Sequence, residues 1–278
     1  MRCYGQYGCY WGCCCGPSLS RRVQGVSDSL TLKLNAQVQE LQRQGVDVAN
    51  LSTGEPDFAV PEASKEAVRA ALKLNRSKYG PVAGVAELRE RVAAKTNAQQ
   101  PTLVKQKGAW KASDVIITNG GKQAIFNAMM AVLEEGQEAL VPAPFWISYP
   151  DMAALAGAKS RILPTQFSNG FKLTPQELKL ALDQVVRAKL LILNSPSNPT
   201  GAVYSRAEFQ ALGRVIAEHP QGKGLWILSD EIYDRVILGN TAFCSFLEAC
   251  PDLRDQVITV NGMSKSAAMT GWRVGWSV

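Results

Sequence analysis

The sequence of 278 residues contains a single histidine, His219. Mechanisms that pair a serine or cysteine nucleophile with a histidine base have little material here, and so do metal sites built from several imidazoles. His219 stands directly before Pro220 at the end of an expected helix, a position that favours both residues. We therefore interpret His219 as a surface turn residue, and the chemistry of the chain must come from other side chains.

Long apolar runs and blocks of like charge are also missing. No apolar run approaches the roughly 20 residues that a membrane helix requires. The net charge of +6, from 30 basic and 24 acidic residues, is modest and dispersed. These absences argue against a membrane protein and against a nucleic-acid-binding protein. Hydrophobic residues make up 46% of the chain, which is enough to bury a large core, so a globular α/β domain is expected.

Cysteine is scarce in the body of the chain, where only Cys244 and Cys250 occur. The others crowd the first fifteen residues: Cys3, Cys9, Cys13, Cys14 and Cys15. Three consecutive cysteines cannot easily face one tetrahedral ion, and no C-x-x-C pair or nearby histidine completes a zinc site, so no metal site is predicted. Residues 1–18 are expected to be an irregular leader without the apolar core of a secretory signal. We expect a cytoplasmic protein, with organellar import through this leader as the alternative.

What the sequence does contain is an alternation of apolar, strand-like runs with segments of helical spacing. Strands are expected at residues 115–118, 139–141, 160–163, 190–193, 225–228 and 257–260. Helices are expected at residues 29–44, 62–74, 85–95, 122–133, 148–155, 175–186 and 205–218. The alternation predicts an α/β fold with a mainly parallel sheet covered by helices on both faces. Residues 105–111 are expected to form a loop insertion.

Three of these strands lead into residues that carry chemistry. Asn198 lies in the turn after one strand, Asp230 follows the next, and Lys265 follows the last, eight residues before Arg273. The carboxyl ends of parallel strands open on one edge of a sheet, where α/β proteins bind ligands. Burial and the neighbouring cation would lower the pKa of the Lys265 amine enough to make it a nucleophile towards a carbonyl. An amine, an acid and hydrogen-bond donors in this arrangement are typical of a pyridoxal phosphate site.

Seven segments, in family order, resemble the class I/II aminotransferases of the fold type I pyridoxal phosphate group, above all their bacterial-type aspartate (aspartate/prephenate) branch. These segments are Ser52-Thr53-Gly54-Glu55-Pro56-Asp57, Lys78-Tyr79-Gly80-Pro81-Val82-Ala83-Gly84, Thr118-Asn119-Gly120-Gly121-Lys122-Gln123, Pro144-Phe145-Trp146, Asn198-Pro199-Thr200-Gly201, Ser229-Asp230-Glu231-Ile232-Tyr233, and Ser264-Lys265 with Gly271-Trp272-Arg273. The resemblance spans roughly residues 19–278.

The resemblance also implies a domain organisation. It places a large pyridoxal phosphate-binding domain at residues 71–278 and, at 19–70, an N-terminal segment that contributes to a small domain and an active-site turn. Residues 1–18 lie outside the match. On the order of a hundred further residues follow in the family. We therefore expect the C-terminal small domain to be incomplete, without the arginine that clamps the substrate carboxylate.

Roles around the cofactor ring follow from the same resemblance. Lys265 is implied to hold the cofactor as an imine, and Asp230 to keep its ring nitrogen protonated. Asn198 and Tyr233 are implied to donate to the phenolic oxygen, and Trp146 to stack on the ring. Without the resemblance, Trp146 also fits a core position and Asn198 fits turn chemistry before a proline.

The phosphate is expected where Gly120 and Gly121 precede a helix, because exposed N–H groups and the helix dipole favour an anion there. Without the resemblance, the two glycines also fit an ordinary turn, and Arg273 fits an exposed strand position. With it, the implied phosphate and cofactor contacts are Gly120, Gly121, Lys122, Ser264, Arg273 and, from a neighbouring subunit, Tyr79.

Substrate contacts are implied for Gly54, Trp146 and Asn198. Because Tyr79 would reach the phosphate of a neighbouring subunit, a homodimer with shared active sites is expected. The chain departs from the family pattern at residue 262, which is glycine where some relatives place a phosphate-binding serine.

The function implied is that of an enzyme, a pyridoxal phosphate-dependent aminotransferase of amino acid biosynthesis. It would move the amino group of an L-amino acid to a 2-oxo acid by ping-pong chemistry on a lysine aldimine, with aspartate and 2-oxoglutarate as the favoured pair. Two alternatives use the same residues: a pyridoxal phosphate-dependent lyase on the same scaffold, and a non-catalytic cofactor-binding fragment. Measured amino transfer would distinguish the aminotransferase from the non-catalytic fragment, and release of keto acid with ammonia would identify the lyase.

Overall fold

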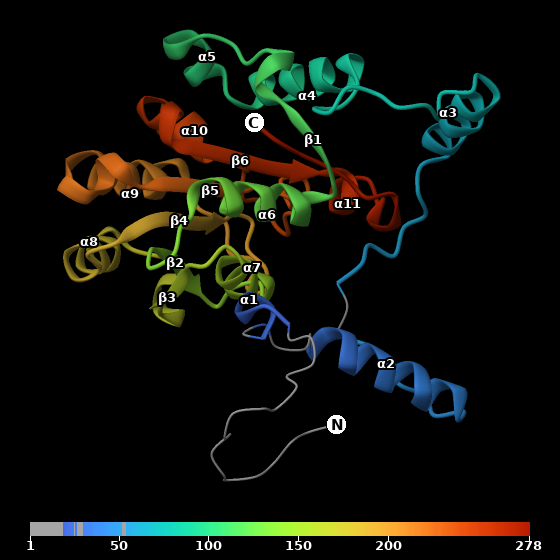
Figure 1. The fold of residues 1–278 in the computed structure, drawn as a ribbon, viewed down its shortest axis with the longest axis horizontal. Helices are drawn as coiled ribbons and strands as arrows, with labels where there is room; N and C mark the ends of the chain where they lie inside the picture. The colour runs from blue at the N-terminus through green and yellow to red at the C-terminus, as the bar shows by residue number, and fades with distance from the viewer. Residues whose placement is uncertain (1–18, 25, 27–29, 52–53) are drawn as a thin grey trace, which may run out of the picture.

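Seven strands form one mixed sheet at the centre of the fold (Figure 1). The computed structural model describes residues 19–24, 26, 30–51 and 54–278, so the expected leader at 1–18 and Ser52-Thr53 of the first motif lie outside the described residues. The strands are β1 (Ile116–Asn119), β2 (Glu138–Ala143), β3 (Lys159–Pro164), β4 (Ala188–Asn194), β5 (Trp226–Asp230), β6 (Val257–Gly262) and β7 (Val274–Ser277).

The sheet order is β1-β7-β6-β5-β4-β2-β3. All neighbouring pairs are parallel except those of β7, which runs antiparallel to both β1 and β6. The expectation of a mainly parallel sheet is therefore confirmed. Each of the six expected strands is present, either extended by one or two residues at one or both ends or shifted by one or two residues.

Helices cover both faces of this sheet (Figure 1). The described α-helices are α1 (Arg21–Gln24), α2 (Leu30–Arg43), α3 (Glu62–Lys73), α4 (Ala86–Gln99), α5 (Pro101–Lys107), α6 (Gly121–Val132), α7 (Ser148–Leu155), α8 (Pro175–Gln184), α9 (Arg206–Glu218), α10 (Phe246–Ala249) and α11 (Met263–Ser266). One expectation is wrong, because residues 105–107 are the last turn of α5 and not part of a loop. A proline in the first turn of α5 and Gly108 at φ +86° after its end are ordinary start and stop residues for a helix.

The alternation of side chains along β4 divides the core into two layers. Leu191 and Leu193 point into one layer, which α8, α9 and α10 cover. Leu190 and Ile192 point into the other, which α6 and α7 cover. All four side chains are buried. Such a continuous apolar run is typical of a parallel strand that is covered on both faces, and each buried side chain contributes about 1.5–3 kcal/mol.

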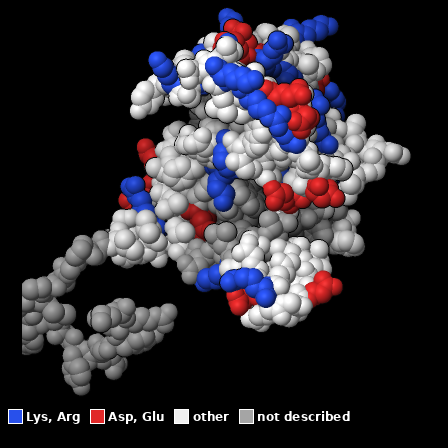
Figure 2. Space-filling view, turned by 90° about the vertical axis from the view of Figure 1, so that its right-hand side faces the viewer, with Lys and Arg blue, Asp and Glu red and all other residues white. Residues whose placement is uncertain are grey.

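Two of the N-terminal helices, α2 and α3, lie apart from these layers. In Figure 1, α2 and α3 stand to one side of the sheet, and no residue of α3 is buried. The domain boundary expected near residue 70 stays a prediction. Figure 2 shows acidic and basic side chains interspersed over one face of the molecule, in line with the dispersed charge of the sequence. Among the described helices, none has the length and apolar character needed to cross a bilayer.

Three adjacent parallel strands set the position of the functional residues. β4 ends at Asn194, which is paired in register with Asp230 at the end of β5. Asp230 is paired in turn with Val260 of β6, and α11 with Lys265 follows β6 directly. The ends of β4, β5 and β6 therefore bring their following residues to the same edge of the sheet.

Candidate active site

A cavity of about 680 Å³ opens at this edge of the sheet. Most of the residues predicted from the sequence line it. They come from the N-terminal segment, the start of α6, the segment between β2 and α7, the end of β5, and the segments after β4, β5 and β6. They are Gly54, Gly121, Lys122, Trp146, Asn198, Asp230, Tyr233, Ser264, Lys265 and Arg273. The fold thus brings together in one cavity residues that lie more than 200 positions apart in the sequence.

Lys265 projects into the cavity from the short helix α11. Its Nζ donates a hydrogen bond to the carbonyl oxygen of Gly54 and lies 5.8 Å from the centre of the Tyr233 ring. Burial lowers the pKa of the amine, the positive charge of Arg273 acts in the same direction, and the carboxylate of Glu55 opposes them. Burial and a second cation were the two causes expected from the sequence. The amine is therefore easier to deprotonate than an exposed lysine.

Asp230 forms the floor of the cavity at the end of β5 and is only 4% exposed. Its Oδ2 accepts a hydrogen bond of 2.7 Å from the Tyr149 hydroxyl, and its Oδ1 accepts one of 3.2 Å from the backbone N–H of Ile232. Burial raises the pKa of the carboxyl to about 6, although both hydrogen bonds act to lower it. Neither donor is cationic, so the carboxylate is suited to a positively charged group in the cavity.

A corner suited to an anion lies where α6 begins. Gly120 has φ +82°, and the Arg273 guanidinium packs so closely on it that a Cβ at residue 120 would collide with Nη2. The guanidinium donates to the carbonyl oxygens of Thr270 at 2.7 Å and Asn119 at 3.3 Å. The first N–H groups of a helix have no partner within the helix. Together with Arg273 they form a suitable site for a phosphate.

Aromatic side chains and Asn198 complete the walls. Trp146 meets the Tyr149 ring edge-on at 5.3 Å, and the Nζ of Lys122 lies 4.9 Å from the centre of the Trp146 ring. Burial raises the pKa of the Tyr233 phenol, the charge of Asp230 adds to this, and a hydrogen bond with the Asn198 side chain acts in the opposite direction. Tyr233 and Asn198 therefore meet beside Lys265, as donors to a shared oxygen would.

Two of the expected residues do not line the cavity. Gly120 lies behind it against Arg273, as described above. Tyr79 lies between α3 and α4 and is fully exposed, so its expected contact with a neighbouring subunit stays a prediction. At residue 262 a Cβ would lie 2.8 Å from the carbonyl oxygen of Val274 and 3.1 Å from Gly275 Cα. Close packing of β6 on β7 therefore favours glycine here over the serine of some relatives.

Four polar residues of the cavity lining were not found from the sequence. Tyr149, the donor to Asp230, lies three residues after Trp146, and this helical spacing is the only feature that indicated it. Asn194, at the end of β4, lines the cavity beside Asn198. The Thr270 hydroxyl and the Glu55 carboxylate are joined by a hydrogen bond on the cavity lining. Both residues lie within quoted motifs, but other residues of those motifs were assigned the roles.

Comparisons with known proteins agree with this geometry. A model of the family described as aminotransferase class I and II matches residues 46–278. The aspartate/prephenate aminotransferase of Thermus thermophilus is 41% identical over 259 residues, which are 93% of this chain and 63% of that protein. The corresponding protein of Nitrosomonas europaea is 36% identical over 258 residues, which are 93% of this chain and 62% of that protein.

Solved structures give the same relationship. The aspartate aminotransferase of Thermus thermophilus with maleate has a TM-score of 0.85 and 41% identity, over 94% of this chain and 64% of that one. The chain thus spans 62% to 63% of the length of the two curated relatives described above.

Proposed function

Since the chain belongs to the class I and II aminotransferase family, we propose that its cavity is the active site of a pyridoxal phosphate-dependent aminotransferase. L-Aspartate is the proposed amino donor and 2-oxoglutarate the proposed acceptor. The observation that carries the proposal is the placement of Lys265, with its lowered pKa, and the deeply buried Asp230 on one cavity. The aspartate in the names of the relatives supports the donor.

The residues fit the ring of this cofactor. A protonated ring nitrogen would compensate the buried charge of Asp230, to which the described residues supply only neutral donors. Trp146 offers an aromatic surface on the cavity wall, which suits stacking. Asn198 and Tyr233 offer donors for the phenolic oxygen. When bound, the cofactor supplies an aldehyde carbon for an amine and an electron-withdrawing ring.

The charges of the cavity fit a phosphate and a dicarboxylic substrate. Arg273 and the start of α6 would hold the phosphate of the cofactor. Lys122 places a further cation over Trp146 inside the cavity, where it can meet a carboxylate of the substrate. The Thermus thermophilus relative was solved with maleate, which is a dicarboxylate. These observations support aspartate and 2-oxoglutarate, both dicarboxylic, over monocarboxylic substrates.

Lys265 performs both covalent binding and proton transfer in this proposal. Its Nζ would hold the aldehyde carbon of the cofactor, with loss of water, and the amine of the substrate would take its place and leave the lysine amine free. The freed amine would then take the proton from the substrate Cα as a base and, as an acid, deliver it to the former aldehyde carbon of the cofactor. Its lowered pKa leaves more of the amine unprotonated at neutral pH, as a base requires. Because amino donor and acceptor use the site in turn, ping-pong kinetics are expected.

The proposal includes a homodimer and a cytoplasmic location. Tyr79 is fully exposed at the turn before α4. In a homodimer, Tyr79 of one copy can therefore reach the cofactor phosphate in the cavity of the other copy. Cys244 and Cys250 are both free thiols, and this fits a reducing compartment.

Steady-state amino transfer tests the proposed reaction. With the cofactor loaded, aspartate and 2-oxoglutarate should give glutamate and oxaloacetate, with parallel lines in double-reciprocal plots. The measurement is a coupled assay of both products. Release of 2-oxo acid with ammonia, without glutamate, would assign a lyase instead. Cofactor binding with neither set of products would assign a non-catalytic protein.

Gly120→Ala should weaken the binding of pyridoxal phosphate by about tenfold or more, the equivalent of roughly 1.4 kcal/mol. The added Cβ would collide with the Arg273 guanidinium and displace it from the start of α6. Titration of protein fluorescence with pyridoxal phosphate measures the dissociation constant. Gly108→Ala is the matched control, because Gly108 also has a positive φ but no neighbour within 4 Å of the added Cβ. Equal loss of affinity in both variants would mean that backbone strain, and not Arg273, sets the affinity.

A further inference from the structure

We propose that Asn194 is a positioning residue that fixes Asp230 and Asn198 relative to each other, and thereby aligns the groups that contact the two sides of the cofactor ring. This role presupposes the function proposed above. Asn194 is the last residue of β4 and was not among the residues that the sequence singled out.

The side-chain amide of Asn194 uses both of its ends. Its Nδ2 donates a hydrogen bond of 2.9 Å to the backbone carbonyl oxygen of Asp230. Its Oδ1 accepts one of 2.7 Å from the backbone N–H of Asn198. The backbone N–H of Ser195 donates to the same Asp230 carbonyl at 3.2 Å. One rigid, planar group therefore joins the end of β5 to the turn that follows β4.

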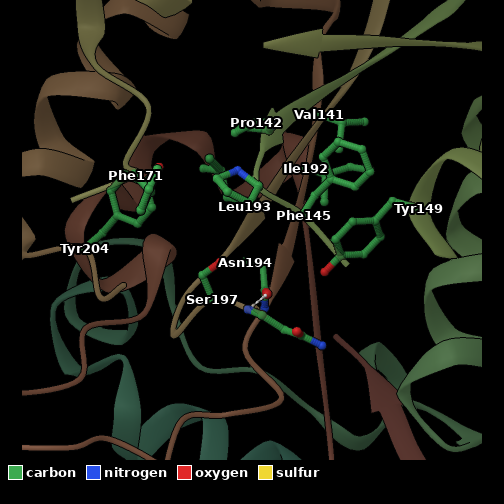
Figure 3. A pocket seen from close by; sticks show the side chains of 12 residues that line it. Val141, Pro142, Phe145, Tyr149, Phe171, Ile192, Leu193, Asn194, Ser197 and Tyr204 are labelled. Carbon is green, nitrogen blue, oxygen red and sulfur yellow. Dashed lines mark hydrogen bonds between the residues drawn. The ribbon is translucent and has the colours of Figure 1, made fainter. Parts of the chain in front are cut away.

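The surroundings of Asn194 strengthen these bonds. Figure 3 shows the Asn194 side chain, with its bond to the Asn198 backbone as a dashed line, below Ile192, Leu193 and Phe145. The cavity that these residues line has only about 20 Å³, room for about one water molecule. The two hydrogen bonds of Asn194 are partly buried, and the apolar wall limits competition from water on this side of the amide, so each has a stronger effect on position than at an open surface.

The two anchored residues face the cofactor site from different directions. Asp230 presents its carboxylate at the cavity floor, and Asn198 meets the Tyr233 phenol beside Lys265. The register of β4 and β5 ends at Asn194 and Asp230, so beyond it no strand pairing holds the turn of Asn198 against Asp230. Because functional groups must lie within about 0.5 Å of their working geometry, the amide of Asn194 supplies alignment that the sheet no longer provides.

Asparagine is the residue that serves both contacts. Aspartate has the same shape but two acceptor oxygens, so Asn194→Asp keeps an acceptor for the Asn198 N–H and sets a second oxygen against the Asp230 carbonyl. Alanine removes both contacts. Asn194→Asp should therefore disturb the Asp230 side alone, whereas Asn194→Ala should disturb both sides.

The test compares these two variants with Ser195→Ala. Ser195 lies on the same turn, and its Oγ accepts a hydrogen bond from the Tyr204 N–H and not from Asp230 or Asn198. In the free chain, NMR-detected exchange of the Asn198 amide should accelerate about fivefold in Asn194→Ala, the change expected from the loss of one hydrogen bond of about 1 kcal/mol, and stay near the wild-type rate in Asn194→Asp and Ser195→Ala.

In the chain loaded with pyridoxal phosphate, the pH dependence of visible absorbance gives the pKa of the cofactor-bonded Lys265 nitrogen. Asn194→Ala should raise this pKa by about half a unit to one unit, because a displaced Asn198 donates less well to the phenolic oxygen and that oxygen then holds the neighbouring proton more tightly. The affinity for pyridoxal phosphate should fall about tenfold in both Asn194 variants, while Ser195→Ala should leave the pKa and the affinity near wild type.

The outcomes separate this role from the proposed function. A wild-type chain that forms no visible band with pyridoxal phosphate would refute the function itself. A wild-type band with Asn194 variants that match Ser195→Ala in exchange, pKa and affinity would overturn the role of Asn194 alone. Circular dichroism checks that each variant is folded. Asn194→Asp keeps the shape of the side chain, so its affinity decides the question if Asn194→Ala does not fold.

Discussion

Replacing Lys265 by alanine should abolish the visible band that pyridoxal phosphate forms with the chain and lower amino transfer by about three orders of magnitude or more. The variant loses both the amine that bonds to the cofactor and the base that removes the substrate proton. Borohydride reduction followed by peptide mapping measures the first effect, because it fixes the cofactor covalently to the amine that carries it. In the wild-type chain the reduced adduct should map to Lys265.

Lys265→Arg is the matched control for charge. It keeps a cation beside Tyr233 and Gly54, but a guanidinium does not serve as the required amine. Both variants should therefore lack the adduct while circular dichroism shows the wild-type fold. An adduct on Lys122, which also lines the cavity, would show that the covalent site was assigned to the wrong lysine.

The strands of the fold were predictable because each is a short apolar run bounded by polar or turn residues. Side chains of β4 are buried on both faces, and this leaves a continuous pattern in the sequence that needs no knowledge of neighbours. The end of α5 was not predictable in this way. Its last turn reads Lys105-Gln106-Lys107 without apolar spacing, and the helix is held by the fully buried Leu103 in the core below β4.

The site residues also fall into those that the sequence could predict and those that it could not. Lys265 and Asp230 could be predicted because each follows an apolar strand, so that the chain itself places them at the edge of the sheet. Tyr149 could not, because its bond to Asp230 spans 81 residues and depends on how α7 packs on the sheet. Asn194 directly follows the strand expected at 190–193, and nothing in the sequence distinguishes it from the turn residues after it. Only the register of β4 on β5 reveals that its amide joins two functional segments.

Asp230→Asn should suppress proton removal from the substrate by several orders of magnitude, each factor of ten corresponding to roughly 1.4 kcal/mol of barrier. The amide keeps an acceptor for the Tyr149 hydroxyl but no longer supplies the negative charge that holds a proton on the ring nitrogen. Single-turnover spectroscopy of the half-reaction with aspartate measures this step. Near-normal rates would mean that another group holds the ring nitrogen.

Glu231→Gln is the matched control, because Glu231 is the adjacent buried carboxyl and lies outside the cavity lining. Its Oε1 accepts from the hydroxyls of Ser229 and Ser245 and from the N–H of Phe246. Burial raises its pKa to about 7. If Asp230 acts through the cofactor, Glu231→Gln should leave the half-reaction rate within a few-fold of the wild type, since it removes a comparable buried charge without touching the ring.

The same pair of variants predicts how stability depends on pH in the free chain. Burial raises the pKa of Asp230 from an ordinary 3.8 to about 6, so between these values the folded chain binds more protons than the unfolded one. The free energy of unfolding should therefore fall as pH rises from 4 to 6, by roughly 2 to 3 kcal/mol from Asp230. Asp230→Asn should remove this decline, whereas Glu231→Gln should remove the separate decline that extends to about pH 7.

Pyridoxal phosphate should offset the Asp230 decline, because its ring cation compensates the carboxylate, and leave the Glu231 decline unchanged. Urea unfolding at several pH values, with and without the cofactor, measures both; a cofactor effect equal for the two carboxyls would contradict a direct contact between Asp230 and the ring.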